Sequence, residues 1–173
     1  MLPLNITYPK KLVYGCGSIK NFIEYINNVY NDSKEESVFI LTIKALYNKV
    51  SEICELLKFR PEIETLNDNE PLYSDFYNLQ KIVLKVKPTI ITGIGGGSVL
   101  DMVKLLSAFA ENIVDLKNYE GKNKIVKRTT KLICIPTTSG TGSEMSPNAI
   151  LKDDTTGIKN AFISEALIPD FVY

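Results

Sequence analysis

Short apolar runs alternate with longer amphipathic segments along most of the chain. Runs rich in β-branched and aromatic residues predict buried strands at 11–14, 38–42, 89–92 and 131–135, with a further short strand within 60–66. Apolar residues at helical spacing predict helices that begin at Ser18, near Leu46, after Pro71 and at Val99. Strands that alternate with helices are typical of an α/β fold. We therefore predict a Rossmann-like parallel sheet with helices on both faces.

The last third of the chain has a different pattern. Two short apolar stretches, 149–151 and 158–163, flank the polar sequence Asp-Asp-Thr-Thr-Gly at 153–157. Such a turn between two strands predicts a C-terminal β-hairpin. Residues 166–173 resemble a strand that leads out of the domain. A length of 173 residues then fits one domain spanning 1–173.

Composition excludes several classes of partner. Lysine plus arginine equals aspartate plus glutamate at 20 each, so no net positive charge attracts nucleic acid, and the basic segment 122–131 is interpreted as a solvated loop. The three cysteines form no C-x-x-C pair, which fits a reducing compartment. The N-terminus lacks the apolar core of a leader peptide, and no apolar run approaches the roughly 20 residues of a membrane span. We therefore predict a cytoplasmic protein without a membrane or nucleic-acid partner.

A glycine-rich loop follows the predicted strand at 89–92. Gly93 to Ser98 lies where an α/β sheet leaves a crevice, and where helix amides can bind a phosphate. The dinucleotide fingerprint G-x-G-x-x-G is matched only in part, because Ser98 replaces its last glycine. Ser98 and Asp101 have the spacing of a capping box. Asp101 can therefore be a helix cap, a direct cofactor contact, or both.

A second polar loop follows the strand at 131–135. Residues 137–143 offer five hydroxyls and two glycines, and the chain contains no histidine that could act as a general base. Hydroxyls and free amides can bind a ribose and a diphosphate without a net charge. Paired with the glycine-rich loop, this loop is interpreted as the second wall of a nucleotide site rather than as a plain connection.

Together the two loops resemble a known family. Gly95-Gly96-Gly97-Ser98-x-x-Asp101-x-x-Lys104, followed by Ile135-Pro136-Thr137-Thr138-Ser139-Gly140-Thr141-Gly142-Ser143-Glu144, is similar to the iron-containing (group III) alcohol dehydrogenases, and so is the start with Pro9 and Gly15-Cys16-Gly17-Ser18. The resemblance covers nearly the whole chain. It implies an N-terminal domain that binds NAD or NADP, and a C-terminal helical domain in which one Asp and three His hold Fe²⁺ or Zn²⁺.

The resemblance also implies roles for individual residues. The cofactor-binding set would be Gly95, Gly96, Gly97, Ser98, Asp101, Thr137, Thr138, Thr141 and Lys159. Gly96 to Ser98 would bracket the diphosphate, the threonines would line the ribose and nicotinamide side, and Lys159 would be a cofactor-contacting lysine of the hairpin. The implied reaction is hydride transfer between a small alcohol and its aldehyde or ketone. No catalytic or metal-binding residue is assigned to this chain, and a homodimer is left open.

Two departures from the family pattern shape these expectations. Family members often read Thr-Asp after the second strand, where this chain reads Thr42-Ile43-Lys44; without that carboxylate NADP becomes an alternative to NAD. The chain also ends before the expected metal-binding helices, so we expect it to be a fragment or truncation that is inactive alone. The alternatives are a non-catalytic dinucleotide-binding module and a relative of glycerol dehydrogenase or dehydroquinate synthase, which share the glycine-rich loop.

Overall fold

The computed structural model describes residues 7–33, 37–67 and 69–173. In this part of the chain, six strands form a sheet in the order β1-β9-β6-β4-β2-β3, and every neighbouring pair is parallel. The strands are β1 (Lys11–Leu12), β2 (Val38–Ile43), β3 (Glu62–Leu66), β4 (Ile90–Gly95), β6 (Lys131–Pro136) and β9 (Phe171–Val172). The predicted Rossmann-like parallel sheet is confirmed, although the opening strand is shorter than the predicted 11–14.

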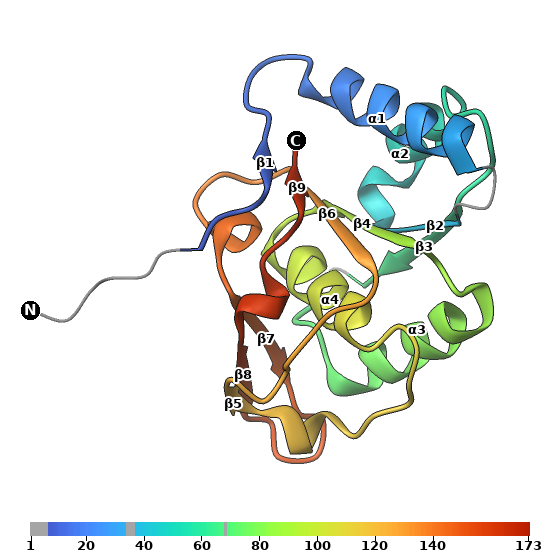
Figure 1. Cartoon of the computed structure of the whole chain (residues 1–173). Coiled ribbons are helices and arrows are strands. Elements are labelled where there is room, and N and C mark those ends of the chain that lie inside the picture. Colours follow the sequence, from blue (N-terminus) through green and yellow to red (C-terminus); the bar gives the residue numbers. More distant parts are fainter. Residues whose placement is uncertain (1–6, 34–36, 68) are drawn as a thin grey trace, which may run out of the picture.

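Helices cover both faces of this sheet (Figure 1). One face carries α1 (Ser18–Ser33) and α2 (Tyr47–Cys54), and the other carries α3 (Tyr73–Val86) and α4 (Gly97–Ala108). Side chains alternate along a strand, so each buried strand contributes to two cores. In β2, for example, Ile40 packs with Phe22 of α1, while Phe39 packs with Phe76 of α3.

Two helices differ in length from the sequence prediction. The helix expected to begin near Leu46 is divided into a 3-10 turn, Lys44–Leu46, and α2, which ends at Cys54. The helix expected to begin at Val99 begins two residues earlier, at Gly97. Helix α1 ends at Ser33, and residues 34–36 lie outside the described residues.

A small second sheet contains the predicted hairpin. Strands β7 (Asn148–Lys152) and β8 (Lys159–Ile163) pair antiparallel, and β5 (Gly121–Lys122), which the sequence pattern does not predict, adds to β8. In the turn, the Asp153 carboxylate accepts hydrogen bonds from the amide and the hydroxyl of Thr155. Gly157 takes a left-handed φ of 71°, which favours glycine. This hairpin packs against α4 through β7, and Figure 1 shows β7 and β8 on the side of the domain that carries this helix.

The basic segment 122–131 is only partly a solvated loop. Arg128 donates to the carbonyl oxygens of Thr130, Ala166 and Ile168, and its Nη1 lies 2.6 Å from Asp170 Oδ2. Burial acts to raise the pKa of Asp170, but hydrogen bonds from Arg128 and a backbone amide outweigh it and lower this pKa. Arg128 therefore fixes the connection into β9.

Candidate functional site

The glycine-rich loop and the hydroxyl-rich loop lie side by side. They follow β4 and β6, which are neighbours in the sheet with Gly95 opposite Pro136. The amide of Thr137 donates to the carbonyl of Gly95 at 3.0 Å. Because parallel strands end at the same edge of a sheet, the two loops meet at the crevice where α/β proteins bind ligands.

Glycines allow this close approach. A Cβ on Gly96 would lie 3.3 Å from Thr138 Oγ1, and a Cβ on Gly97 would lie 3.2 Å from Thr141 Cγ2. Gly95 has a different role, because a Cβ there would lie 2.7 Å from a methyl group of Val99. Gly95 is thus required for packing α4 on its own strand, while Gly96 and Gly97 let the two loops approach each other closely.

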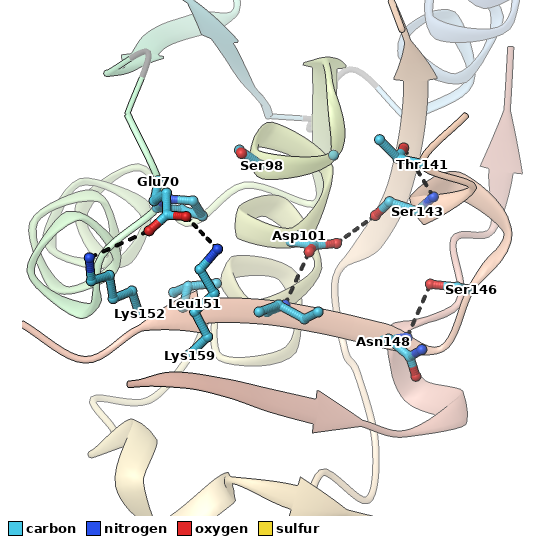
Figure 2. Close-up of a pocket in the computed structure, with 13 residues that line it drawn as sticks. Glu70, Ser98, Asp101, Thr141, Ser143, Ser146, Asn148, Leu151, Lys152 and Lys159 are labelled. Atoms are coloured by element: carbon cyan, nitrogen blue, oxygen red, sulfur yellow. Dashed lines mark hydrogen bonds and ion pairs between the residues drawn. The ribbon is translucent and has the colours of Figure 1, made fainter. Parts of the chain in front are cut away.

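A cleft of about 420 Å³ opens beside the first turn of α4 (Figure 2). We call it the Asp101 cleft. Of the residues expected to bind cofactor, it brings together Gly97, Ser98, Asp101, Thr141 and Lys159. Its other lining residues come from the segment before α3, the end of the hydroxyl-rich loop and strand β7: Glu70, Pro71, Ser143, Ser146, Asn148, Ile150, Leu151 and Lys152.

The other four expected residues do not line the Asp101 cleft. Thr137 and Thr138 line a second cleft of about 460 Å³, with Tyr14, Met145 and Tyr173 among its other lining residues. Gly95 and Gly96 line neither of these two clefts. The hydroxyl-rich loop therefore divides its threonines between two clefts. This division does not follow from the order of residues in the loop.

The predicted capping box at the start of α4 is wrong. The N-cap residue is Gly96, so Ser98 is already inside the helix, and the cap makes no side-chain hydrogen bond. The carboxylate of Asp101 instead accepts from Ser143 Oγ at 2.5 Å and from the amide of Ile150 at 3.1 Å. Asp101 joins α4 to the hydroxyl-rich loop and to β7, because it faces the hairpin rather than the end of its own helix.

Lys104 completes this connection from one turn further along α4. Its ammonium group is fully buried and donates to Ser143 Oγ (3.1 Å), the carbonyl of Ser146 (3.0 Å) and the carbonyl of Asn148 (2.7 Å). Asp101 Oδ1 lies 3.7 Å from Lys104 Nζ. Burial raises the pKa of Asp101 and lowers the pKa of Lys104, while their mutual attraction acts in the opposite direction on each.

Sequence reasoning assigned no individual role to Lys104, Ser143 or Glu70; Ser143 was only one of the five hydroxyls of the second loop. A signal for Lys104 existed, since this lysine interrupts a helix whose neighbouring positions 102, 103, 105 and 106 are all apolar. A lysine in such surroundings is rarely fully buried unless it is paired. No pattern in the sequence pointed to Glu70, whose carboxylate pairs with Lys159 and Lys152 at the mouth of the cleft.

Among the described residues, no three His, Cys, Asp or Glu side chains come together in a way that could hold a metal ion. Within the same residues, no helix is both long and apolar enough to cross a membrane.

The model of the iron-containing alcohol dehydrogenase family matches residues 9–173. The chain belongs to this family. It is 32% identical over 180 residues to aldehyde-alcohol dehydrogenase 2 of Entamoeba histolytica, covering 93% of this chain and 20% of that protein. It is 29% identical over 174 residues to the NADPH-dependent aldehyde reductase YqhD of Escherichia coli, covering 96% and 43% respectively.

The fold agrees with the family. The alcohol dehydrogenase from Oenococcus oeni superposes with a TM-score of 0.85 at 23% identity, over 98% of this chain and 45% of that structure. The resemblance read from the two loops is therefore confirmed. This iron-containing alcohol dehydrogenase chain spans less than half the length of each of these relatives.

Proposed function

We propose that this chain is the dinucleotide-binding part of an alcohol dehydrogenase, and that the Asp101 cleft receives NAD or NADP for reaction with a small alcohol or aldehyde. The observation that carries the proposal is the cradle at the start of a 12-residue helix, where Gly97 faces Thr141 on the wall of the cleft and the preceding Gly96 faces Thr138. Helix N-termini present unpaired amides and a partial positive charge, which stabilise a phosphate.

The lining residues fit the parts of a dinucleotide. The amides of Gly97 and Ser98, with the exposed Ser98 hydroxyl, would hold the diphosphate. Lys159 would contact a phosphate or a ribose hydroxyl from the hairpin. Ile150, which is 46% exposed on the cleft wall, offers an apolar surface for a nicotinamide ring. Asp101 would act on the cofactor mainly by fixing Ser143 and the position of Ile150.

The cofactor would supply or accept the hydride, and this chain would bind and orient it. The described residues supply no metal site, so we assign no step on this chain to a metal. The family name implies iron, and we place its ligands in the part of the relatives that this chain does not span.

For the choice of dinucleotide, we propose NADP. Ile43 ends β2 and the exposed Lys44 follows it, so no carboxylate stands where family members often carry one. A lysine attracts a 2′-phosphate that a carboxylate would repel. The NADPH dependence named for the Escherichia coli relative is consistent with this choice.

Binding of NADH and NADPH, followed by nicotinamide fluorescence and calorimetry, tests the proposal. We expect saturable binding to the wild-type chain and none to Gly96→Val, whose branched side chain would fill the cradle. Gly96 has φ −79°, which any residue can adopt, but a Cβ there would press on Thr138 Oγ1 at 3.3 Å, so circular dichroism must show that the variant is folded. Unchanged affinity in a folded Gly96→Val variant would remove the cradle as the cofactor site.

Charge reversal at Lys44 tests the dinucleotide preference. Lys44→Glu should weaken NADPH binding more than NADH binding, because only NADPH carries the 2′-phosphate. Lys49→Glu is the matched control, since Lys49 is also exposed and lies further along α2. An equal loss for both dinucleotides would contradict the assignment of Lys44.

A further inference from the structure

Glu70 lies at the mouth of the Asp101 cleft and is shared by two lysines of the hairpin. Its Oε1 atom pairs with Lys159 Nζ, and its Oε2 atom lies 3.5 Å from Lys152 Nζ. Figure 2 shows the two ammonium groups approaching the carboxylate from different sides. All three residues line the cleft. The one lysine expected to contact the cofactor is therefore already paired.

The segment that carries Glu70 is fixed to the hairpin by its backbone. The amide of Lys152 donates to the carbonyl of Pro71 at 2.9 Å. Further along, the amide and hydroxyl of Ser74 both donate to the carboxylate of Asp154, at 2.9 and 2.6 Å. These bonds hold the start of α3 against the hairpin, so Glu70 stays beside Lys159 without depending on its own ion pairs.

The charge of Glu70 persists at neutral pH. The hydrogen bond from Lys159 lowers the pKa of this carboxyl below its ordinary value. A diphosphate that enters the cleft thus meets a carboxylate close to the lysine that would neutralise it. Binding must separate Lys159 from Glu70 or place two anions near each other, and either event opposes binding.

We propose that Glu70 competes with the cofactor phosphates for Lys159 and so limits the affinity of the cleft for anionic nucleotides. This inference rests on the proposed function of the cleft. To bind, a ligand must replace the Glu70 carboxylate at Lys159, which requires negative charge on the ligand and further contacts with the cleft.

The size of the effect follows from the exposure of the groups. The side chains of Lys159 and Glu70 are 59% and 49% exposed, so solvent weakens their interaction. Removing one exposed negative charge a few ångströms from a dianionic group should change the affinity by roughly 3- to 10-fold at low salt. The change should shrink as salt rises, because the screening length falls from about 10 Å at 0.1 M to about 3 Å at 1 M.

The test is calorimetry of ADP-ribose, NADH and NADPH with the wild-type chain and with Glu70→Gln, which removes the charge and keeps the shape. We expect all three ligands to bind Glu70→Gln more tightly, by roughly 3- to 10-fold at low salt. Glu111→Gln is the matched control, because Glu111 is exposed beyond the C-terminal end of α4, opposite the cleft. In a Lys159→Met background, the gain from Glu70→Gln should be smaller, since the lysine it would release is gone.

The possible results separate the two proposals. If the wild type binds and Glu70→Gln binds equally well, the role of Glu70 is overturned and the cofactor cleft stands. If Glu70→Gln binds more weakly, the role is also overturned, because the carboxylate itself would then hold the ligand. If Glu111→Gln raises the nucleotide affinity as much as Glu70→Gln does, the effect comes from the net charge of the chain, and the role of Glu70 is again overturned. If neither the wild type nor Glu70→Gln binds any of the three nucleotides, the proposed function fails and the inference fails with it.

Discussion

The buried ammonium group of Lys104 should hold the hydroxyl-rich loop in place, and Lys104→Met removes it at nearly constant side-chain length. Its three N–H groups are matched by three acceptors within 3.1 Å, which are Ser143 Oγ and the carbonyls of Ser146 and Asn148. Methionine can fill the space but donates nothing. Two backbone carbonyls and Asp101 would then lose a partner on the wall of the Asp101 cleft, where the lysine side chain itself is fully buried.

The magnitude follows from these losses. A buried acceptor left without a donor costs about 1–3 kcal/mol, and removing one partner of a buried ion pair costs about 3–5 kcal/mol. The losses overlap, because Asp101 keeps its hydrogen bonds from Ser143 and Ile150. We therefore expect a fall of about 3–5 kcal/mol in the free energy of unfolding. For a domain of this size, that corresponds to a melting temperature lower by roughly 6–20 °C.

Urea denaturation and thermal melting measure this loss. Lys81→Met is the control, since Lys81 is exposed on α3 and its replacement should change stability by no more than about 0.5 kcal/mol. The double variant Asp101→Asn/Lys104→Met should lose less than the sum of the single variants, because the two side chains contact the same loop. A loss below about 1 kcal/mol for Lys104→Met would refute the claim that this ammonium group anchors the loop.

Two further predictions concern ionisable groups. Hydrogen bonds from the hydroxyl and amide of Thr155, together with the ion pair to Lys117, lower the pKa of Asp153 to about 2. The ionised Asp153 should therefore contribute fully to stability above the ordinary carboxyl pKa, and this contribution should be lost as pH falls from about 4 towards 2. Acid titration of unfolding should show a shallower slope in this window for Asp153→Asn; identical slopes would contradict the assignment. Burial raises the pKa of Cys54 to about 11 and of Cys134 to about 12, so a thiol reagent at neutral pH should modify the exposed Cys16 rapidly and the other two only after unfolding. Rapid labelling of more than one thiol in the folded chain, counted by mass spectrometry, would show that the cores open.

The local features of this protein were readable from the sequence. Apolar periodicity predicted the parallel sheet, the helices on its two faces and the C-terminal hairpin. The reason is that side chains alternate between the two faces of a strand and return to the same face of a helix about every 3.6 residues, so buried positions recur at these intervals. The two loops were also found, since glycines and hydroxyls concentrated after a buried strand have few other uses. Boundaries were less accurate: α4 starts at Gly97, and Ser98 therefore never becomes a cap.

The tertiary structure alone decided the partners of the charged residues. Asp101 and Ser143 are 42 positions apart in the chain, and their hydrogen bond depends on how the hairpin packs under α4. Glu70 meets Lys159 only because the start of α3 is bound to β7. Spacing within one element predicts contacts along that element, whereas a contact between distant elements depends on the packing of the whole domain. The sequence therefore determined the fold and the loops of the proposed cofactor site, and the packing determined which charges surround it.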